Sequence, residues 1–245
     1  MLLDCGDGQS ERYLRELQRC MREAGCTGLD AIVITHWHCD HVGGIPGVVS
    51  RVSGGVSPPP VRKFLPQQPE PLSKGEGAVD PYSIWPKEKF THLADGTLPN
   101  PSPHQPSSEV TIGRAILIVL HHSQRFIPAH VLTAGQARRW SHAGETVVTQ
   151  GATLRVLHTP GHATDHCCFL LEEEAALFTG DNVLGVGSAV ITELDSYMAS
   201  LQRMANCQPR RLYPGHGPAV EDGPAKLREY QAHRLARIQQ VRVSV

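Results

Sequence analysis

Three histidines and one aspartate fall within six positions, in the order His36-x-His38-x-Asp40-His41, directly after the apolar stretch 29–34. Neutral imidazole nitrogens and carboxylate oxygens are ligands for zinc and its neighbours. Residues two apart on a strand point the same way, so His36 and His38 can bind one ion, whereas Asp40 and His41 lie beyond the strand end and can turn toward a second. A surface histidine cluster is the alternative. The order of the residues and the strand before them favour a metal site.

The composition predicts a globular protein without a membrane span. The 245 residues, 40% of them hydrophobic, suffice for one large α/β domain or two small ones. The longest apolar run, 115–120, is far shorter than the roughly 20 residues that a membrane helix needs. The net charge of −1 gives no support for nucleic-acid binding. From residue 201 onward, however, eight Lys or Arg stand against three Asp or Glu, which fits a solvated helix face and a phosphate-facing surface equally well.

The cysteines predict a reducing compartment. Their number, seven, is odd, no C-x-x-C pair occurs, and Cys167 is adjacent to Cys168, so they do not form a disulfide framework. The N-terminal residues 1–4 read neither as a signal peptide nor as an Arg-rich transit sequence. We therefore expect a protein that is not secreted.

Three segments have apolar residues at helical spacing. The first helix is predicted over 9–24, with Gly25 where a helix would stop. The second is predicted over 195–206, with Asp195 as its cap. The third begins near Pro224. Its apolar residues are Leu227, Tyr230, Leu235, Ile238 and Val241.

Short β-type runs carry the remaining candidate ligands. These runs are 152–158, 168–171, 175–179 and 211–213. Three of them end in turn-forming polar clusters that contain His162, Asp181 and His216. Because strand, turn and then His or Asp recur in this way, we expect every candidate ligand to lie at one edge of the sheets, where a site assembled from distant segments can form.

The stretch 54–146 differs from the rest of the chain. Twelve of the nineteen prolines lie between Pro58 and Pro106, which disfavours a helix or a central strand there. We interpret 54–146 as a partly disordered insertion within a single domain that spans 1–245. Residues 97–144 read as an inserted segment, because 92–96 continues smoothly into 145–148 when they are deleted.

Taken together, the motifs resemble the complete ligand set of the metallo-β-lactamase superfamily. The resemblance implies an α/β (α+β) fold, a four-layer αββα sandwich, that holds two Zn²⁺ ions. It places His36, His38 and His162 on the first ion and Asp40, His41 and His216 on the second, with Asp181 shared between them. Asp4 matches the family's early aspartate, which looks like a group that orients a ligand imidazole. A shared carboxylate also has a physical reason, because it limits the repulsion between two nearby dications.

The resemblance gives three residues catalytic roles. Asp40 and Asp181 would hold the ions around a bridging hydroxide that attacks the substrate. His166 lies four residues after His162 and is expected to contact substrate or to orient His162. True β-lactamase activity is disfavoured, since enzymes of that kind carry a Cys ligand where Asp181 stands.

Residues 2–50 and 147–235 resemble one subgroup more closely, which contains the β-lactamase-like protein 2 endoribonucleases of mitochondria, fungal acyl-carrier-protein thioesterases and glyoxalase-II-like enzymes. Three departures stand out. We expect the first strand pair of the family to be missing ahead of Asp4, which would expose a sheet edge. Residues 97–144 have no counterpart, which fits untranslated sequence retained in a gene model. We also expect the winged-helix tail after the last helix to be absent.

Three functions follow from the resemblance. The first is an endoribonuclease that cleaves single-stranded RNA, located in the mitochondrial matrix or the cytoplasm, with Lys226, Arg228 and Arg234 steering the RNA backbone. The second is a thioesterase that acts on an acyl thioester with the same hydroxide. The third is a catalytically impaired fragment, which the truncated start and the insertion would explain. The ligand set itself does not distinguish the first two.

Overall fold

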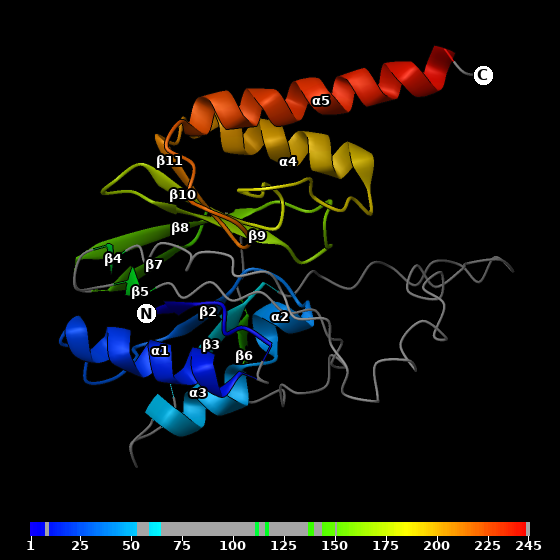
Figure 1. The fold of residues 1–245 in the computed structure, drawn as a ribbon. Coiled ribbons are helices and arrows are strands. Elements are labelled where there is room, and N and C mark those ends of the chain that lie inside the picture. Colours follow the sequence, from blue (N-terminus) through cyan, green and yellow to red (C-terminus); the bar gives the residue numbers. More distant parts are fainter. Residues whose placement is uncertain are drawn as a thin grey trace, which may run out of the picture. The chain divides into compact units, whose positions relative to one another are not determined.

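A computed structural model describes residues 1–7, 10–52, 59–64, 111–112, 116–117, 137–139, 144–149 and 151–243. These residues belong to one compact unit, formed by Met1–Leu65 and Ser107–Val245. Two β-sheets lie at its centre, with helices on the outer face of each (Figure 1). The second unit, Pro66–Pro106, lies outside the described residues.

The N-terminal sheet has six short strands in the order β4-β5-β1-β2-β3-β6. Their bounds are β1 Leu2–Leu3, β2 Ile32–Ile34, β3 Val61–Lys63, β4 Thr111–Ile112, β5 Ile116–Leu117 and β6 Ala137–Arg139. All neighbouring pairs are parallel except β4 and β5. Parallel strands are usually buried on both faces, and β1 and β2 consist of apolar, buried residues only.

The C-terminal sheet has five strands in the order β11-β10-β9-β8-β7. Their bounds are β7 Thr146–Thr149, β8 Ala152–His158, β9 Cys167–Leu171, β10 Ala176–Gly180 and β11 Arg211–Pro214. The strands predicted at 152–158, 168–171, 175–179 and 211–213 are thus confirmed to within one residue at each end. β10 and β11 are parallel, and the remaining pairs are antiparallel.

Alternate residues of the strands face different layers. Leu3 and Val33 belong to a buried cluster that includes Val156 and Phe169 of the other sheet, so this cluster fills the space between the sheets. The neighbours on the same strands, Leu2 and Ile32 among them, pack instead against the N-terminal helices. The outer face of the C-terminal sheet packs in the same way against the last two helices. This order of layers is the four-layer αββα sandwich that the sequence predicted.

Five helices cover the sheets in the described part of the chain. They are α1 Glu11–Glu23, α2 Cys39–Val42, α3 Ile45–Val52, α4 Leu194–Asn206 and α5 Gly223–Val243. α1 begins after Ser10, whose side chain accepts a hydrogen bond from the Tyr13 amide at 3.1 Å. None of the helices described is long and apolar enough to cross a membrane.

Two predictions about the C-terminal helices were wrong in detail. The cap of α4 is Glu193, which accepts from the amides of Asp195 and Ser196, so Asp195 is the second helical residue instead. Leu235 was expected to pack with Leu227 and Tyr230, but it is 52% exposed. Arg234, the residue before it, faces Tyr197 of α4, and successive residues of an α-helix point about 100° apart, so Leu235 is turned away from that layer.

Parts of the segment 54–146 join the N-terminal sheet. β3 begins directly after Pro59 and Pro60, and the Pro60 carbonyl accepts a hydrogen bond from the Ile32 amide at 2.9 Å. The prolines precede the strand, so its own amides stay available for the ladder, and the expectation that this stretch avoids a central strand was too strict. β5 pairs with β1, so β1 is not at an edge of the sheet. Most of 54–146, including nearly all of 97–144, lies outside the described residues, and the interpretation of these segments as insertions stays a prediction.

Candidate metal centre

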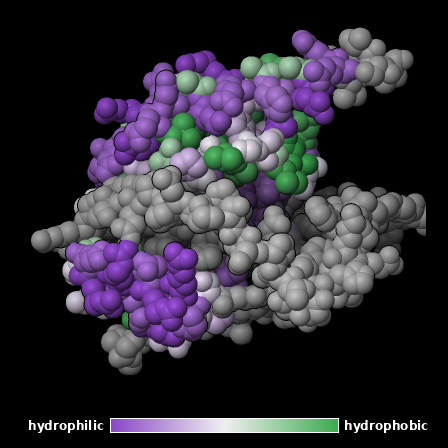
Figure 2. Space-filling model, in the orientation of Figure 1, coloured by the Kyte–Doolittle hydropathy of each residue, from purple (hydrophilic) through white to green (hydrophobic). Residues whose placement is uncertain are grey.

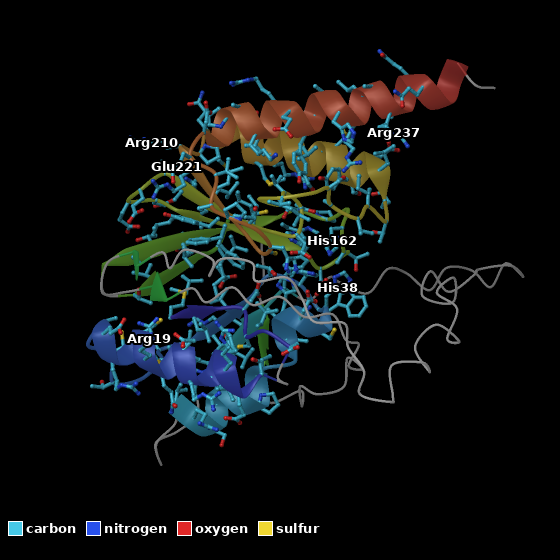
Figure 3. The ribbon with its side chains drawn as sticks, in the orientation of Figure 1. Arg19, His38, His162, Arg210, Glu221 and Arg237 are labelled. Carbon is cyan, nitrogen blue, oxygen red and sulfur yellow. The ribbon has the colours of Figure 1, made fainter. Side chains whose placement is uncertain are left out.

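The chain directions explain why the candidate ligands meet. β8, β10 and β11 run in the same direction, so the turns that follow them lie at one edge of the C-terminal sheet. His162, Asp181 and His216 occupy these turns. The end of β2 reaches the same edge, where the Cys167 amide donates to the Thr35 carbonyl at 2.8 Å and ties the two sheets together. In Figure 3, His38 and His162 approach each other from the two sheets.

The first group of ligands consists of three imidazoles. His36 Nε2 lies 2.8 Å from His38 Nδ1 and 3.2 Å from His162 Nε2, and His162 Nε2 lies 2.9 Å from His38 Nδ1. Ligand nitrogens around a tetrahedral zinc ion are about 3.3 Å apart, given zinc–nitrogen bonds of about 2.05 Å. The three nitrogens therefore converge nearly as a tetrahedral ion requires, and Asp181 completes the group.

The second group contains two carboxylates and two imidazoles. His216 Nε2 lies 3.1 Å from Asp40 Oδ2 and 3.3 Å from Asp181 Oδ2, and His41 Nε2 lies 3.4 Å from Asp181 Oδ1. Asp181 offers a ligand atom to both groups, within each of which all ligand atoms lie within 4.8 Å of one another. The structure thus brings together all seven residues that the sequence nominated as ligands, in the two predicted sets.

Buried atoms without partners test whether this set fits metal ions. His41 Nε2 and Asp181 Oδ1 are both buried and accept or donate no hydrogen bond among the described residues. They form a long ion pair with each other, at 3.4 Å, and buried polar atoms are normally hydrogen-bonded, so both have room for a further partner. A cation between them would supply that partner, and the residues present therefore fit the metal ions that the fold implies.

Hydrogen bonds to the second ring nitrogen orient the ligand imidazoles. Thr35 Oγ1 donates to Asp4 Oδ2 at 2.8 Å, so it accepts from His36 Nδ1 at 2.9 Å, which leaves His36 Nε2 free as a ligand. His41 Nδ1 donates to Asp4 Oδ2 at 2.8 Å, and His162 Nδ1 donates to the Val190 carbonyl at 2.8 Å. Asp4 thus has the orienting role that the sequence suggested.

The variant Asp4→Asn is expected to weaken metal binding at the second group by roughly 10–100-fold, the usual cost of losing such an orienting bond. Asp4 has φ +57°, a conformation that Asn tolerates well, so the variant should fold. The measurement is metal affinity by competition with a chelating dye. Glu23→Gln, which removes an exposed carboxylate of α1, is the control. Equal affinities for the D4N variant and the parent protein would contradict the orienting role.

The two groups differ in protonation. Burial and the neighbouring His162 and His41 lower the pKa of His38 to about 4, and burial above all lowers the pKa values of His36 and His162. These three imidazoles are therefore neutral at neutral pH and offer lone pairs. Burial alone would lower the pKa of His216 as well, but Asp181 and Asp40 raise it to about 9. A metal ion entering the second group must therefore displace a proton.

Glycines next to two of the ligands keep the centre compact. Gly180 has φ +48°, and a Cβ there would lie 2.6 Å from His166 Nε2. A Cβ on Gly215 would lie 2.5 Å from Asp181 Oδ1. Side chains at these positions would collide with the centre, which explains why Asp181 and His216 each follow a glycine.

His166 lies beside the ligands but faces away from solvent. Its side chain is fully buried, and Nε2 accepts a hydrogen bond from the Asp181 amide at 3.1 Å. Nδ1 lies 3.0 Å from Thr159 Oγ1. This position allows His166 to hold the backbone of the shared ligand, and its catalytic role stays a prediction.

Several groups that support the ligands were not predicted from the sequence. Thr35, which directly precedes the histidine cluster, was visible in the sequence as a hydroxyl beside a ligand. The Val190 carbonyl carried no such signal, because any residue offers a carbonyl. The buried ion pair of Lys63 with Asp165, which ties β3 to the loop after His162, was equally hidden, since the two residues are far apart in sequence.

Two sheets packed face to face, covered by helices and joined at one edge by seven convergent ligands, define a class of metal-dependent hydrolases. The comparisons with known proteins agree. A family model described as the metallo-beta-lactamase superfamily matches residues 1–216, and the chain belongs to this superfamily.

The individual relatives carry several names, among them lactamase-like protein, beta-lactamase-like protein 2 homolog and thioesterase. The chain is 29% identical over 241 residues to the beta-lactamase-like protein 2 homolog of Caenorhabditis elegans, which covers 98% of this chain and 60% of the relative. It is 56% identical over 94 residues to the thioesterase pkgB of Emericella nidulans, covering 38% of this chain and 28% of the relative. It is 52% identical over 98 residues to the atrochrysone carboxyl ACP thioesterase of Aspergillus chevalieri, covering 40% of this chain and 32% of the relative.

The solved structures support the fold. A beta-lactamase domain protein from Burkholderia ambifaria has a TM-score of 0.63 and 20% identity, covering 99% of this chain and 67% of that protein. The chain spans about half the length of the first curated relatives that it matches.

Proposed function

We propose that this chain hydrolyses acyl thioesters at a centre of two metal ions. Ions bound there would activate a water molecule and polarise the scissile carbonyl. Two relatives that are more than 50% identical to this chain, over 94 and 98 residues, are named as thioesterases, one of them for an acyl-carrier-protein substrate. The resemblance found in the sequence named such an enzyme as the alternative to an endoribonuclease.

An apolar loop between the two ligand groups carries this proposal. The Gly185 amide donates to the His216 carbonyl at 2.9 Å, and the Val190 carbonyl accepts from His162 at 2.8 Å, so loop 184–190 connects a ligand of each group. Val186 and Val190 on this loop are 69% and 63% exposed. In Figure 2, apolar surface gathers below the hydrophilic surface of α4 and α5. An acyl chain would cover such side chains and gain from leaving water.

The nature of the leaving group also favours a thioester. A thiolate is a weak base that departs without being protonated, whereas an alkoxide departing from RNA requires a general acid. Two titratable residues lie in the loop between His162 and β9, namely Asp165 and His166. Both are buried, with Asp165 paired to Lys63 and His166 bonded to the Asp181 amide, so neither is open to a leaving group.

Cleavage of single-stranded RNA is the second candidate. The alignment with the beta-lactamase-like protein 2 homolog along 98% of the chain favours it, because the sequence resemblance links that subgroup to RNA. Of the three cations expected to steer RNA, Arg228 is exposed and the other two are not available. Lys226 pairs with Glu229 at 3.0 Å, and Arg234 donates to Ser188 and Ala189, so both are engaged within the chain.

Side-by-side assays decide between the candidates. The zinc-loaded protein is expected to release thiol from octanoyl-pantetheine and to leave an unstructured fluorescent RNA oligonucleotide intact. Val186→Ser should raise KM for octanoyl-pantetheine roughly tenfold, since a buried Val side chain contributes about 1.5 kcal/mol. It should change KM little for acetyl-pantetheine, whose acyl chain is much shorter.

Val148→Ser is the matched control, because Val148 on edge strand β7 is 68% exposed, as Val186 is. The V148S variant should behave as the parent protein. RNA cleavage without thioester hydrolysis would reverse the order of the two candidates. A KM effect of V186S that is equal for long and short acyl chains would refute the role of the loop.

A further inference from the structure

Two side chains of α5 hold the loop that lies between the ligand groups. Tyr230 Oη accepts from the Leu184 amide at 3.0 Å and donates to the Gly187 carbonyl at 3.2 Å. Arg234 Nη2 donates to Ser188 Oγ and, at 3.4 Å, to the Ala189 carbonyl. The first half of loop 184–190 is thus bonded to Tyr230, and the second half to Arg234.

The Arg234 side chain is itself fixed in place. Its guanidinium lies 5.8 Å above the centre of the Tyr197 ring, which is fully buried in α4. Tyr197 Oη donates to the Asn182 carbonyl at 2.5 Å, directly after the shared ligand Asp181. A guanidinium that is stacked on a buried ring and bonded to two loop acceptors has little conformational freedom. It therefore fixes the position of the loop relative to α4 and α5.

The segment that Arg234 holds is adjacent to a ligand contact. Ala189 precedes Val190, whose carbonyl accepts from His162 Nδ1. The residues that follow this loop bind the chain next to His162 as well, because the amides of Thr192 and Glu193 donate to the Gly161 carbonyl at 2.8 and 3.1 Å. His162 is therefore oriented by a backbone stretch whose preceding residues are held by α5.

We propose that Arg234 is a positioning residue of the metal centre, which fixes the His162 imidazole through Ser188, Ala189 and the Val190 carbonyl. The effect is confined to the first ligand group, His36, His38 and His162. The second group receives its loop contact at Gly185, on the half of the loop that Tyr230 holds. The inference rests on the metal centre and is independent of the substrate.

The test is the affinity of both ions in the variant Arg234→Met, measured by competition with a zinc-chelating dye. One of the two affinities is expected to fall roughly tenfold, as for other supporting bonds of a metal ligand, and the other to stay within twofold. Arg234→Lys should recover part of the loss, because lysine retains one donor but lacks the planar fork. Arg237→Met is the control, since Arg237 lies on the same helix and bonds only within it, to Gln240, among the contacts described (Figure 3).

Two further variants separate positioning from general damage to the fold. Ser188→Ala removes one acceptor of Arg234 from an exposed loop position. It should lower the affinity for the ion that R234M weakens, but by less than R234M does. The double variant should bind this ion as R234M alone does. In a protein that already carries His162→Ala, adding R234M should leave the remaining ion unaffected. The melting temperature of the metal-free R234M protein should match that of the metal-free parent within a few degrees.

The outcomes test the positioning role of Arg234 separately from the existence of the metal centre. A parent protein that binds no zinc would refute both. A parent protein that binds two ions, with R234M affinities equal to its own, would refute only the positioning role. Equal weakening of both ions together with a large fall in the metal-free melting temperature would show that Arg234 serves the fold alone.

Discussion

Replacing Asp181 by asparagine is expected to abolish hydrolysis and to leave the protein with at most one weakly bound ion. Asp181 is the residue that both ligand groups share, and its Oδ1 is buried without a hydrogen-bond partner among the described residues. An amide keeps the shape of the side chain but lacks the charge that would limit repulsion between two dications. We expect kcat/KM to fall roughly a thousandfold or more, because bound ions contribute several kcal/mol to transition-state stabilisation.

Metal content by elemental analysis, measured together with thioester hydrolysis, tests this prediction. The control is Glu221→Gln, which alters an exposed carboxylate paired with Arg211. The E221Q variant should retain both ions and full activity. A D181N protein that still binds two ions with the affinities of the parent would show that the carboxylate is not shared.

Removing the metal should lower the melting temperature by roughly 5–10 °C. The centre is buried, and in the absence of ions it holds two unsatisfied atoms and a set of crowded imidazole nitrogens. A ligand at a hundred times its Kd stabilises the folded state by about 2.7 kcal/mol, and each kcal/mol shifts the melting temperature of a domain of this size by about 2–4 °C. Calorimetry with and without a chelator measures the effect.

The D181N variant serves as the matched control for metal removal, because a chelator should hardly shift its melting temperature. Restored melting of the parent protein after zinc is added back would exclude damage by the chelator. If neither the chelator nor added zinc changes the melting temperature of the parent protein, the third hypothesis from the sequence, a catalytically impaired fragment, would be supported.

The ligands were predictable because each stands in a local pattern with its own chemistry. His36, His38, Asp40 and His41 form one cluster after a strand, and the glycine before Asp181 marks a close approach of the backbone. The strands of the C-terminal sheet were predictable for a similar reason, since their apolar runs are bounded by turn residues. In both cases neighbouring residues carry the signal.

Contacts between distant segments were not predictable in this way. The pairing of β5 with β1 joins residues more than a hundred positions apart. The Val190 carbonyl and the loop-holding role of Arg234 depend on backbone positions that any sequence could offer. Arg234 was instead expected to steer an RNA backbone, because charge alone does not show which partner a side chain finds.

The seven ligands come from both sheets, since His36, His38, Asp40 and His41 follow β2, whereas His162, Asp181 and His216 follow strands of the other sheet. A bound ion is therefore a cross-link that can form only after the two layers have docked. If cobalt replaces zinc, its absorbance should change when the ligands of both sheets bind it. Stopped-flow absorbance during refolding would then measure the rate at which the two layers associate, separately from the rate at which each layer forms.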